Sequence, residues 1–260
     1  MKRVAPQMLK VCLMCAGFLV VALWGRGWAA QADLTVQPNV VRIGTWYDGA
    51  KIHVRAHIPQ GCQAVMELSG KPGLVKLMRK ERYWGMWKNG EEILEQGAPG
   101  LYLAMSTDSK LLSSLSKNPF WGYDAIAGKV SFTGAARNIA SPQLFEEFLR
   151  LQESRGRYGI FPGQANIRVS PEKRQIVEGI FNLPTHLVQG SYRVDLSVVK
   201  DGRVVSQEMC PLKVVMVGFP AGIFNLAREH ALAYGFLAAG IAILAGFLVG
   251  FLFQFFGKPK

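Results

Sequence analysis

Two histidines are the first residues whose type and spacing could do chemistry. His53 and His57 alternate with apolar residues in "KIHVRAHI" (51–58), so both would lie on one face of a strand. At about 3.3 Å per residue they stand roughly 13 Å apart, which is too far for both to bind one metal ion. We therefore interpret them as solvent-facing side chains.

The four cysteines form two pairs. Cys12 and Cys15 make a CxxC, a spacing used in redox and metal chemistry, but they lie in an N-terminal segment that we expect to be removed. Cys62 and Cys210 remain. They could form a disulfide that joins an early strand to a late one, or stay two buried thiols.

The signatures of common enzyme classes are absent from the sequence. It contains no GxSxG, HExxH, GxxxxGK[ST] or GxGxxG motif and no EF-hand loop. We therefore expect a protein that is not an enzyme, with no catalytic residue, no cofactor site and no metal site.

The stretch "RKERYWGMWKNG" (79–90) combines three aromatic with four basic residues. Read as a strand over 82–87, it would place Tyr83 and Trp87 on one face and Trp84 on the other. We expect core packing to account for most of these aromatic side chains, while the outward one would join the basic residues in a patch for a protein partner or the membrane. The candidate contact residues here are Arg79, Arg82, Trp84 and Trp87.

Residues 1–32 predict a signal peptide. Basic residues precede a short apolar run, 11–24, and small residues follow it at "AQA". The run is shorter than the roughly 20 residues that span a bilayer. Cleavage after Ala32 fits the rule of small residues, and cleavage after Ala29 fits nearly as well.

Residues 231–256 predict a transmembrane helix, because they carry no charge and only Gln254 as a strongly polar side chain. Lys258 and Lys260 follow in the tail, 257–260, and positive charge marks the cytoplasmic side. We therefore expect a single-pass protein of the bacterial cytoplasmic membrane with residues 33–218 in the periplasm.

Net charge narrows the class of partner. Of the 30 Lys and Arg, four precede the expected cleavage point, so 26 remain against 18 acidic residues, a net charge of +8. Because we expect the body to be exported, we expect no nucleic-acid partner. Anionic lipid, an acidic protein or a small anion fits better.

Small residues recur every four positions along the predicted membrane helix, and the last two form GxxxG, which lets another helix approach closely. They are Ala238, Ala242, Gly246 and Gly250. In the juxtamembrane segment 219–230, Arg228, Glu229 and His230 could contact a headgroup or a partner subunit, or could serve as an ordinary interfacial anchor.

The exported body reads as mainly β. Strand patterns occupy 33–105 and return at 165, with an Asp-Gly hairpin turn at 201–202. A helix is expected over 141–156 and a shorter one near 108–117, so we place a helical insertion near 106–160. The final strands, with Tyr192 as a candidate tyrosine corner, suggest an immunoglobulin-like β-sandwich. One sandwich with an insertion and two small lobes both remain open.

Four segments in this order carry a resemblance: "RKERYWGMWKNG", "LFEEFLRLQESRGRYG", "FNLPTHLVQGSYRVDLSVVKDGRVV" and "FNLAREHALAYGFLAAGIAILAGFLVG". Together they resemble the alphaproteobacterial predicted transmembrane protein family. The resemblance implies an exported body with one C-terminal membrane helix, often encoded near permeases similar to sulfite exporters. It implies no catalytic residue.

From these observations we expect a non-enzymatic accessory or interaction subunit of a membrane transporter, with a multi-pass membrane protein as partner. The alternative is a periplasmic module that binds or senses a small anion through basic residues on the sheet. An undetected hydrolase is a more distant third.

Overall fold

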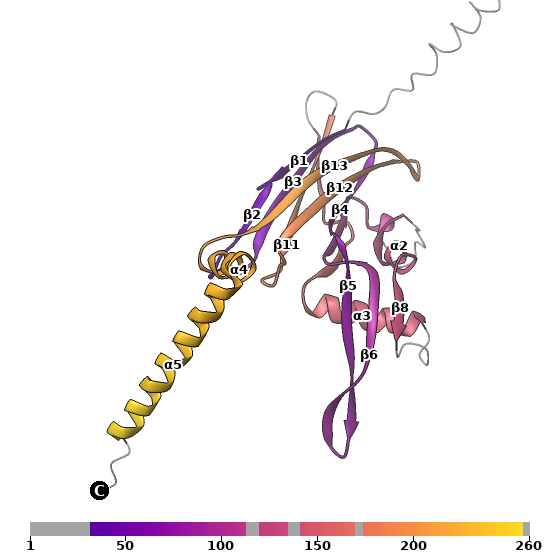
Figure 1. Cartoon of the computed structure of the whole chain (residues 1–260). Coiled ribbons are helices and arrows are strands. Elements are labelled where there is room, and N and C mark those ends of the chain that lie inside the picture. The colour runs from indigo at the N-terminus through magenta and orange to yellow at the C-terminus, as the bar shows by residue number, and fades with distance from the viewer. Residues whose placement is uncertain (1–31, 113–119, 135–140, 170–173, 257–260) are drawn as a thin grey trace, which may run out of the picture.

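The protein is mainly β, with three sheets, a few helices and one long apolar C-terminal helix (Figure 1). The computed structural model describes residues 32–112, 120–134, 141–169 and 174–256. The predicted signal peptide, apart from Ala32, and the predicted tail 257–260 lie outside the described residues.

Two sheets build the body of the molecule. The four-stranded sheet has the order β1-β3-β11-β10, and the six-stranded sheet has the order β2-β13-β12-β4-β7-β9. The strands of the first are β1 (Asp33–Gln37), β3 (Ala50–Pro59), β10 (Asn166–Val169) and β11 (Arg174–Leu183). Those of the second are β2 (Val40–Ile43), β4 (Gln63–Gly70), β7 (Tyr102–Ser106), β9 (Tyr158–Phe161), β12 (Gly190–Lys200) and β13 (Arg203–Met216).

The inner faces of these two sheets share one hydrophobic core. The predicted alternation in β3 is confirmed, since Ile52 and Val54 are buried while His53 and Arg55 are exposed. Side chains of the six-stranded sheet meet them from the opposite side. At Gly179 the sheets come so close that a Cβ would lie 2.2 Å from the sulfur of Met105. The two sheets curl around this core into a half-barrel (Figure 1).

A second core covers the other face of the six-stranded sheet. Phe148 on helix α3 (Ser141–Ser154), Trp121 at the start of helix α2 (Gly122–Ala127) and Tyr102 on β7 are its large buried members. The predicted helix over 141–156 is confirmed, and Gly156 ends it at a φ of 66°. In place of the helix expected near 108–117 there is a single turn of 3-10 helix, η1 (Ser109–Leu111), and residues 113–119 lie outside the described part.

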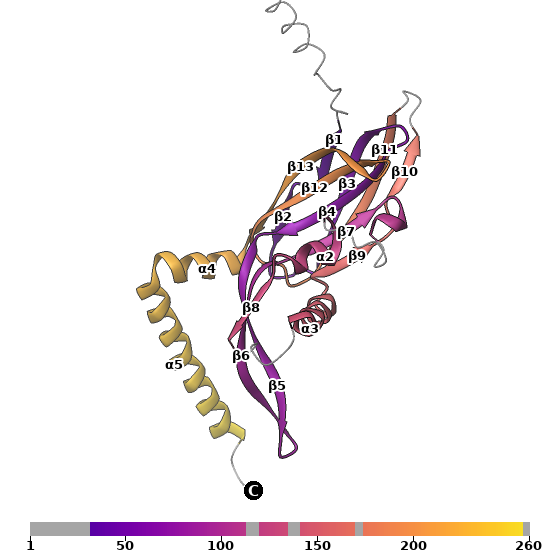
Figure 2. The same ribbon diagram turned by 90° about the vertical axis from the view of Figure 1, so that its right-hand side faces the viewer.

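The third sheet is a long hairpin with one extra strand at its base. Strands β5 (Pro72–Tyr83) and β6 (Met86–Pro99) pair along their length, and β8 (Ser131–Gly134) pairs only with residues 93–96 of β6. Beyond that point the hairpin is a two-stranded ribbon that projects away from the body (Figures 1 and 2).

The predicted strand over 82–87 is wrong. Tyr83 pairs with Met86, and the chain reverses between them at Trp84 and Gly85, whose φ angles are 49° and 79°. These angles define a two-residue type I′ turn, the connection that best matches the twist of antiparallel strands. The glycine at the second turn position was the only local sign of it.

Two helices end the described chain. Helix α4 (Phe219–Glu229) follows β13 directly, and α5 (Ala231–Phe256) follows it after His230. The amide of His230 donates to the carbonyl of Leu226, and its own carbonyl accepts from the amide of Tyr234. The bend at His230 turns α5 away from α4 at a steep angle (Figure 2).

We expect the base of the hairpin to require a glycine at position 97. Its φ is 102°, and a Cβ there would lie 2.1 Å from the carbonyl oxygen of Lys129. Gly97→Ala should lower the free energy of unfolding by roughly 2–4 kcal/mol, from backbone strain and overpacking together, as measured by urea denaturation in mild detergent. Gly128→Ala is the matched control, because Gly128 has a right-handed φ of −68° and open space around it. Equal effects of the two variants would contradict this role.

Candidate functional site

The C-terminal helix is the first candidate contact surface. The most apolar 18-residue window within Ala231–Gln254 has a mean hydropathy of 2.5, and none of that window is buried within the described structure. A helix that is apolar on every face and is not buried against the described rest of the chain is typical of a membrane span.

A groove runs along the second half of α5. Gly246 and Gly250 line it together with Gln254, which follows at the same spacing of four residues. The sequence analysis singled out both glycines and missed that the one strongly polar side chain of the helix lies on their face. Ala238 and Ala242 are exposed on the preceding turns, outside the residues that line the groove.

Helix α4 carries an exposed apolar surface. Phe219, Ile223 and Phe224 are exposed, and they join Met216 of β13 in a shallow apolar groove. Arg228, Glu229 and His230, predicted to contact a headgroup or a partner subunit, lie at the C-terminal end of α4. The guanidinium of Arg228 lies 5.5 Å from the centre of the Phe224 ring, and His230 forms the bend between the helices. These contacts favour an interfacial helix.

The aromatic side chains at the hairpin apex are exposed, so the prediction that most of them pack in a core is wrong. Tyr83 is 67% exposed, Trp84 87%, Met86 72% and Trp87 70%. Arg82 is exposed beside them, and the side chain of Arg79 lies outside the described structure. A local period of two cannot show that a strand extends beyond the core, which is why the prediction failed.

Trp84 occupies a backbone conformation that suits other residues better. A left-handed φ costs a residue with a Cβ roughly 1–2 kcal/mol, and Asn, Asp and Gly adopt it most readily. The turn between β12 and β13 has nearly the same angles, 49° and 75°, and uses Asp201 and Gly202 there. The same chain thus contains the ordinary form of this turn and a form with tryptophan at its apex.

The predicted disulfide between Cys62 and Cys210 does not form in this structure, where both cysteines are free. Cys210 pairs with Val194 near the start of β12, whereas Gln63, next to Cys62, pairs with Val199 near its end. Val194 and Val199 are about 16 Å apart along β12, at about 3.3 Å per residue, and β12 lies between the two cysteines. Cys62 and Cys210 are therefore much further apart than the roughly 7 Å between Cα atoms that a disulfide allows.

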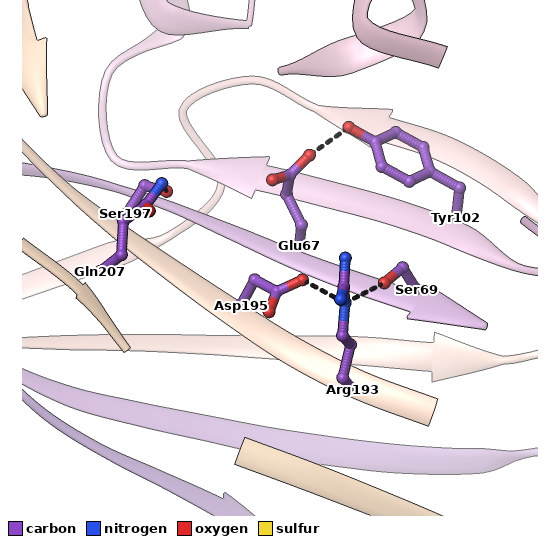
Figure 3. Close-up of polar contacts among 7 residues, drawn as sticks. All are labelled: Glu67, Ser69, Tyr102, Arg193, Asp195, Ser197 and Gln207. Atoms are coloured by element: carbon purple, nitrogen blue, oxygen red, sulfur yellow. Dashed lines mark hydrogen bonds and ion pairs between the residues drawn. The ribbon is translucent and has the colours of Figure 1, made fainter. Parts of the chain in front are cut away.

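A small polar cleft lies between the six-stranded sheet and α2, with a volume of about 150 Å³. Glu67 and Asp195 are direct neighbours on β4 and β12 and both line it. The hydroxyl of Tyr102 donates to Glu67 and accepts from the amide of Gly122. Arg193 bonds Asp195 at 2.9 Å and Ser69 at 3.3 Å (Figure 3).

Burial shifts the acids of this cleft toward their neutral forms. Desolvation raises the pKa of Glu67, the hydrogen bond from Tyr102 lowers it, and the charge of Asp195 raises it. Desolvation likewise raises the pKa of Asp195, against the opposing charge of Arg193. No sequence motif marks these residues. Their pairing follows only from the strand register.

A wider groove of about 630 Å³ lies on the outer face of the four-stranded sheet. His53, Arg55 and His57 face it from β3 and Arg168 from β10. Both arginines bond Glu178 of β11, at 2.7 Å and 3.6 Å. Within the part of the chain that the structure describes, no group of three His, Cys, Asp or Glu residues could hold a metal ion.

Comparison with known proteins places these features in a family. Residues 32–255 match the family described as "Putative transmembrane protein (Alph_Pro_TM)". The chain belongs to this family. The match includes the β-rich body, the hairpin and nearly all of α5, which confirms the resemblance seen in the sequence. Comparison with functionally curated proteins finds no match.

We expect Glu67 to make this family member less stable as the pH rises. Because its pKa is raised in the folded state, the folded chain holds the proton more tightly than the unfolded chain, and that contribution is lost as pH rises through the carboxylate range. Glu67→Gln keeps an oxygen that accepts from Tyr102. Its free energy of unfolding relative to wild type should therefore increase between about pH 4 and pH 7.

Urea denaturation at several pH values checks this, with Glu146→Gln on the exposed face of α3 as the control. A constant difference between Glu67→Gln and wild type across the range would show that Glu67 ionises alike in both states.

Proposed function

We propose that this protein is a non-enzymatic, single-pass subunit that supports a multi-pass transporter of the bacterial cytoplasmic membrane. The observation that carries the proposal is the groove on α5, where Gly246, Gly250 and Gln254 share one face of a helix that is not buried within the described part of the chain. The choice of a transporter as the partner rests on the gene neighbourhood that the family resemblance implies.

The chemistry of the groove suits a second helix. Glycines every four residues let two backbones approach closely, and a side-chain amide in hydrocarbon is stabilised when it hydrogen-bonds across the helix pair. Such a bond contributes about 1 kcal/mol. Within α5 no other strongly polar side chain competes for this role.

The basic tail after α5 and the predicted signal peptide support a periplasmic position for the β-rich body. Lys258 and Lys260 follow the span directly, and positive charge is retained on the cytoplasmic side. Helix α4 would then lie at the periplasmic surface of the membrane, with its exposed phenylalanines toward the lipid.

We further propose that the body is an immunoglobulin-like sandwich. In such folds strands A, B, E and D form one sheet and C, F and G the other. Strands β1, β3, β11 and β10 correspond to the first set and β4, β12 and β13 to the second. The hydroxyl of Tyr192 donates to the carbonyl of Val188 at 2.7 Å, as expected for a tyrosine corner at strand F. The hairpin is then an insertion after strand C.

Crosslinking in native membranes tests the partner. The full chain, expressed at its natural level, is crosslinked briefly, solubilised in mild detergent and purified, and its companions are identified by mass spectrometry. We expect one multi-pass protein with wild type and its loss with Gly246→Leu/Gly250→Leu, because two leucines fill the groove.

Gly240→Leu is the matched control. It lies about 120° around the helix from Gly246, at 100° per residue, and adds the same side chain to the same helix. Recovery of the companion with all three proteins would show that the groove does not hold it. Absence of any companion with wild type would contradict the accessory role.

Binding of a small anion is the second candidate function. The groove on the outer face of the four-stranded sheet favours it, because Arg55, His57 and Arg168 converge there. Glu178 already bonds both arginines, so an anion would have to compete with its carboxylate. This competition is why we rank the anion site second.

Calorimetric titration with sulfate tests the second candidate. Glu178→Gln should strengthen binding several-fold because it frees both arginines, and Arg168→Gln should weaken it. Arg203→Gln, at the start of β13 in the other sheet, should leave it unchanged. No heat with either wild type or Glu178→Gln would rule this function out for sulfate.

A further inference from the structure

The apex of the β5–β6 hairpin is an exposed apolar surface. Its four large side chains, Tyr83, Trp84, Met86 and Trp87, are each at least 67% exposed. None of them belongs to a core cluster among the described residues. The apex lies at the far end of the ribbon from both cores (Figure 1).

The backbone of the apex points to a contact outside the chain. Trp84 takes the left-handed turn position that Asp201 takes in the other type I′ turn of the protein. Tryptophan is the less favourable residue there, and its side chain is 87% exposed. Among the described residues, Trp84 belongs to no core cluster whose packing would offset the strain and the exposure.

The positive charge around the apex favours an anionic partner. Residues 79–88 carry four basic residues and one acidic residue, a net charge of +3. Lys80, Arg82 and Lys88 are exposed beside the aromatic side chains. Tryptophan and tyrosine concentrate at the boundary between headgroups and acyl chains, and basic residues beside them are attracted to anionic lipid.

The hairpin and α5 leave the body toward the same side, and the apex reaches about as far from the body as the C-terminal end of α5 (Figures 1 and 2). The membrane that holds α5 therefore lies on the side of the apex, and the apex meets its near surface only when α5 inclines away from the hairpin. The stem of the ribbon cannot enter hydrocarbon, because both of its edges are unpaired beyond β8 and it carries the exposed ion pair between Lys76 and Glu92. Only the apex can insert.

We propose that the apex of the β5–β6 hairpin inserts into the interfacial layer of the anionic membrane that holds α5, as a second membrane contact. It fixes the tilt of the β-rich body over the bilayer. For the apex to rest at the surface, α5 inclines away from the hairpin at the bend formed by His230. This inference does not depend on a transporter partner.

Tryptophan quenching by brominated lipid tests the proposal in the absence of any other protein. The full chain, with its signal peptide removed and Trp46→Phe introduced, retains the two tryptophans of the apex and the buried Trp121. It is reconstituted in nanodiscs of equimolar phosphatidylglycerol and phosphatidylcholine with brominated acyl chains. We expect strong quenching, and protection of the same emission from acrylamide relative to detergent.

Trp84→Asp is the decisive variant, because it gives the hairpin the Asp-Gly turn that β12 and β13 already use. This variant should unfold at an equal or higher urea concentration than wild type. Brominated lipid should no longer quench the remaining apex tryptophan, Trp87, and acrylamide should reach it as freely as it does in detergent. Asp201→Trp, the reverse change in the other turn, should lower stability, and the emission that the added tryptophan contributes should not be quenched by brominated lipid.

Two results would overturn the proposal. If brominated lipid fails to quench the apex while acrylamide reaches it as freely as in detergent, the apex does not insert, and a protein partner becomes the better occupant. If quenching is equal in discs of phosphatidylcholine alone, the preference for anionic lipid is wrong.

Discussion

The structure depends on two strands that are buried on both faces. In β4, Met66 and Leu68 point into the core between the sheets, and Val65 points into the second core beneath the helices. In β12, Leu196 and Val199 divide in the same way. Strands covered on both sides read as nearly continuous apolar runs and resist local opening. The four-stranded sheet, helices α2 and α3 and the base of the hairpin are all positioned against this pair.

The hairpin shows how such a frame supports an exposed surface. Its base is held by Ile93, by the pairing with β8 and by the close approach of Gly97 to Lys129. At its apex the large apolar side chains are at least 67% exposed and belong to no core cluster among the described residues. A rigid base with a free apex is the arrangement expected of an element whose contact lies outside the molecule.

The contact between the six-stranded sheet and α2 contains buried polar groups, whereas the rest of the second core is apolar. Tyr102 is 5% exposed, yet its hydroxyl is satisfied by Glu67 on one side and by the amide of Gly122 on the other. A buried hydroxyl without such partners would destabilise the fold by about 1–3 kcal/mol. The two bonds therefore fix where α2 sits on the sheet, which apolar packing alone would specify less sharply.

The sequence alone determined the features that local patterns encode. The period of two in β3, the helix before Gly156, the Asp-Gly turn after β12 and the apolar length of α5 each follow from residues within a short window. The tertiary structure decided the features that depend on contacts between segments distant in sequence. It exposed Trp84 and Trp87, separated Cys62 from Cys210, and brought Glu67 to Tyr102. Periodicity reports which side chains share a face, whereas burial depends on the partner strands that cover that face, and those are distant in sequence.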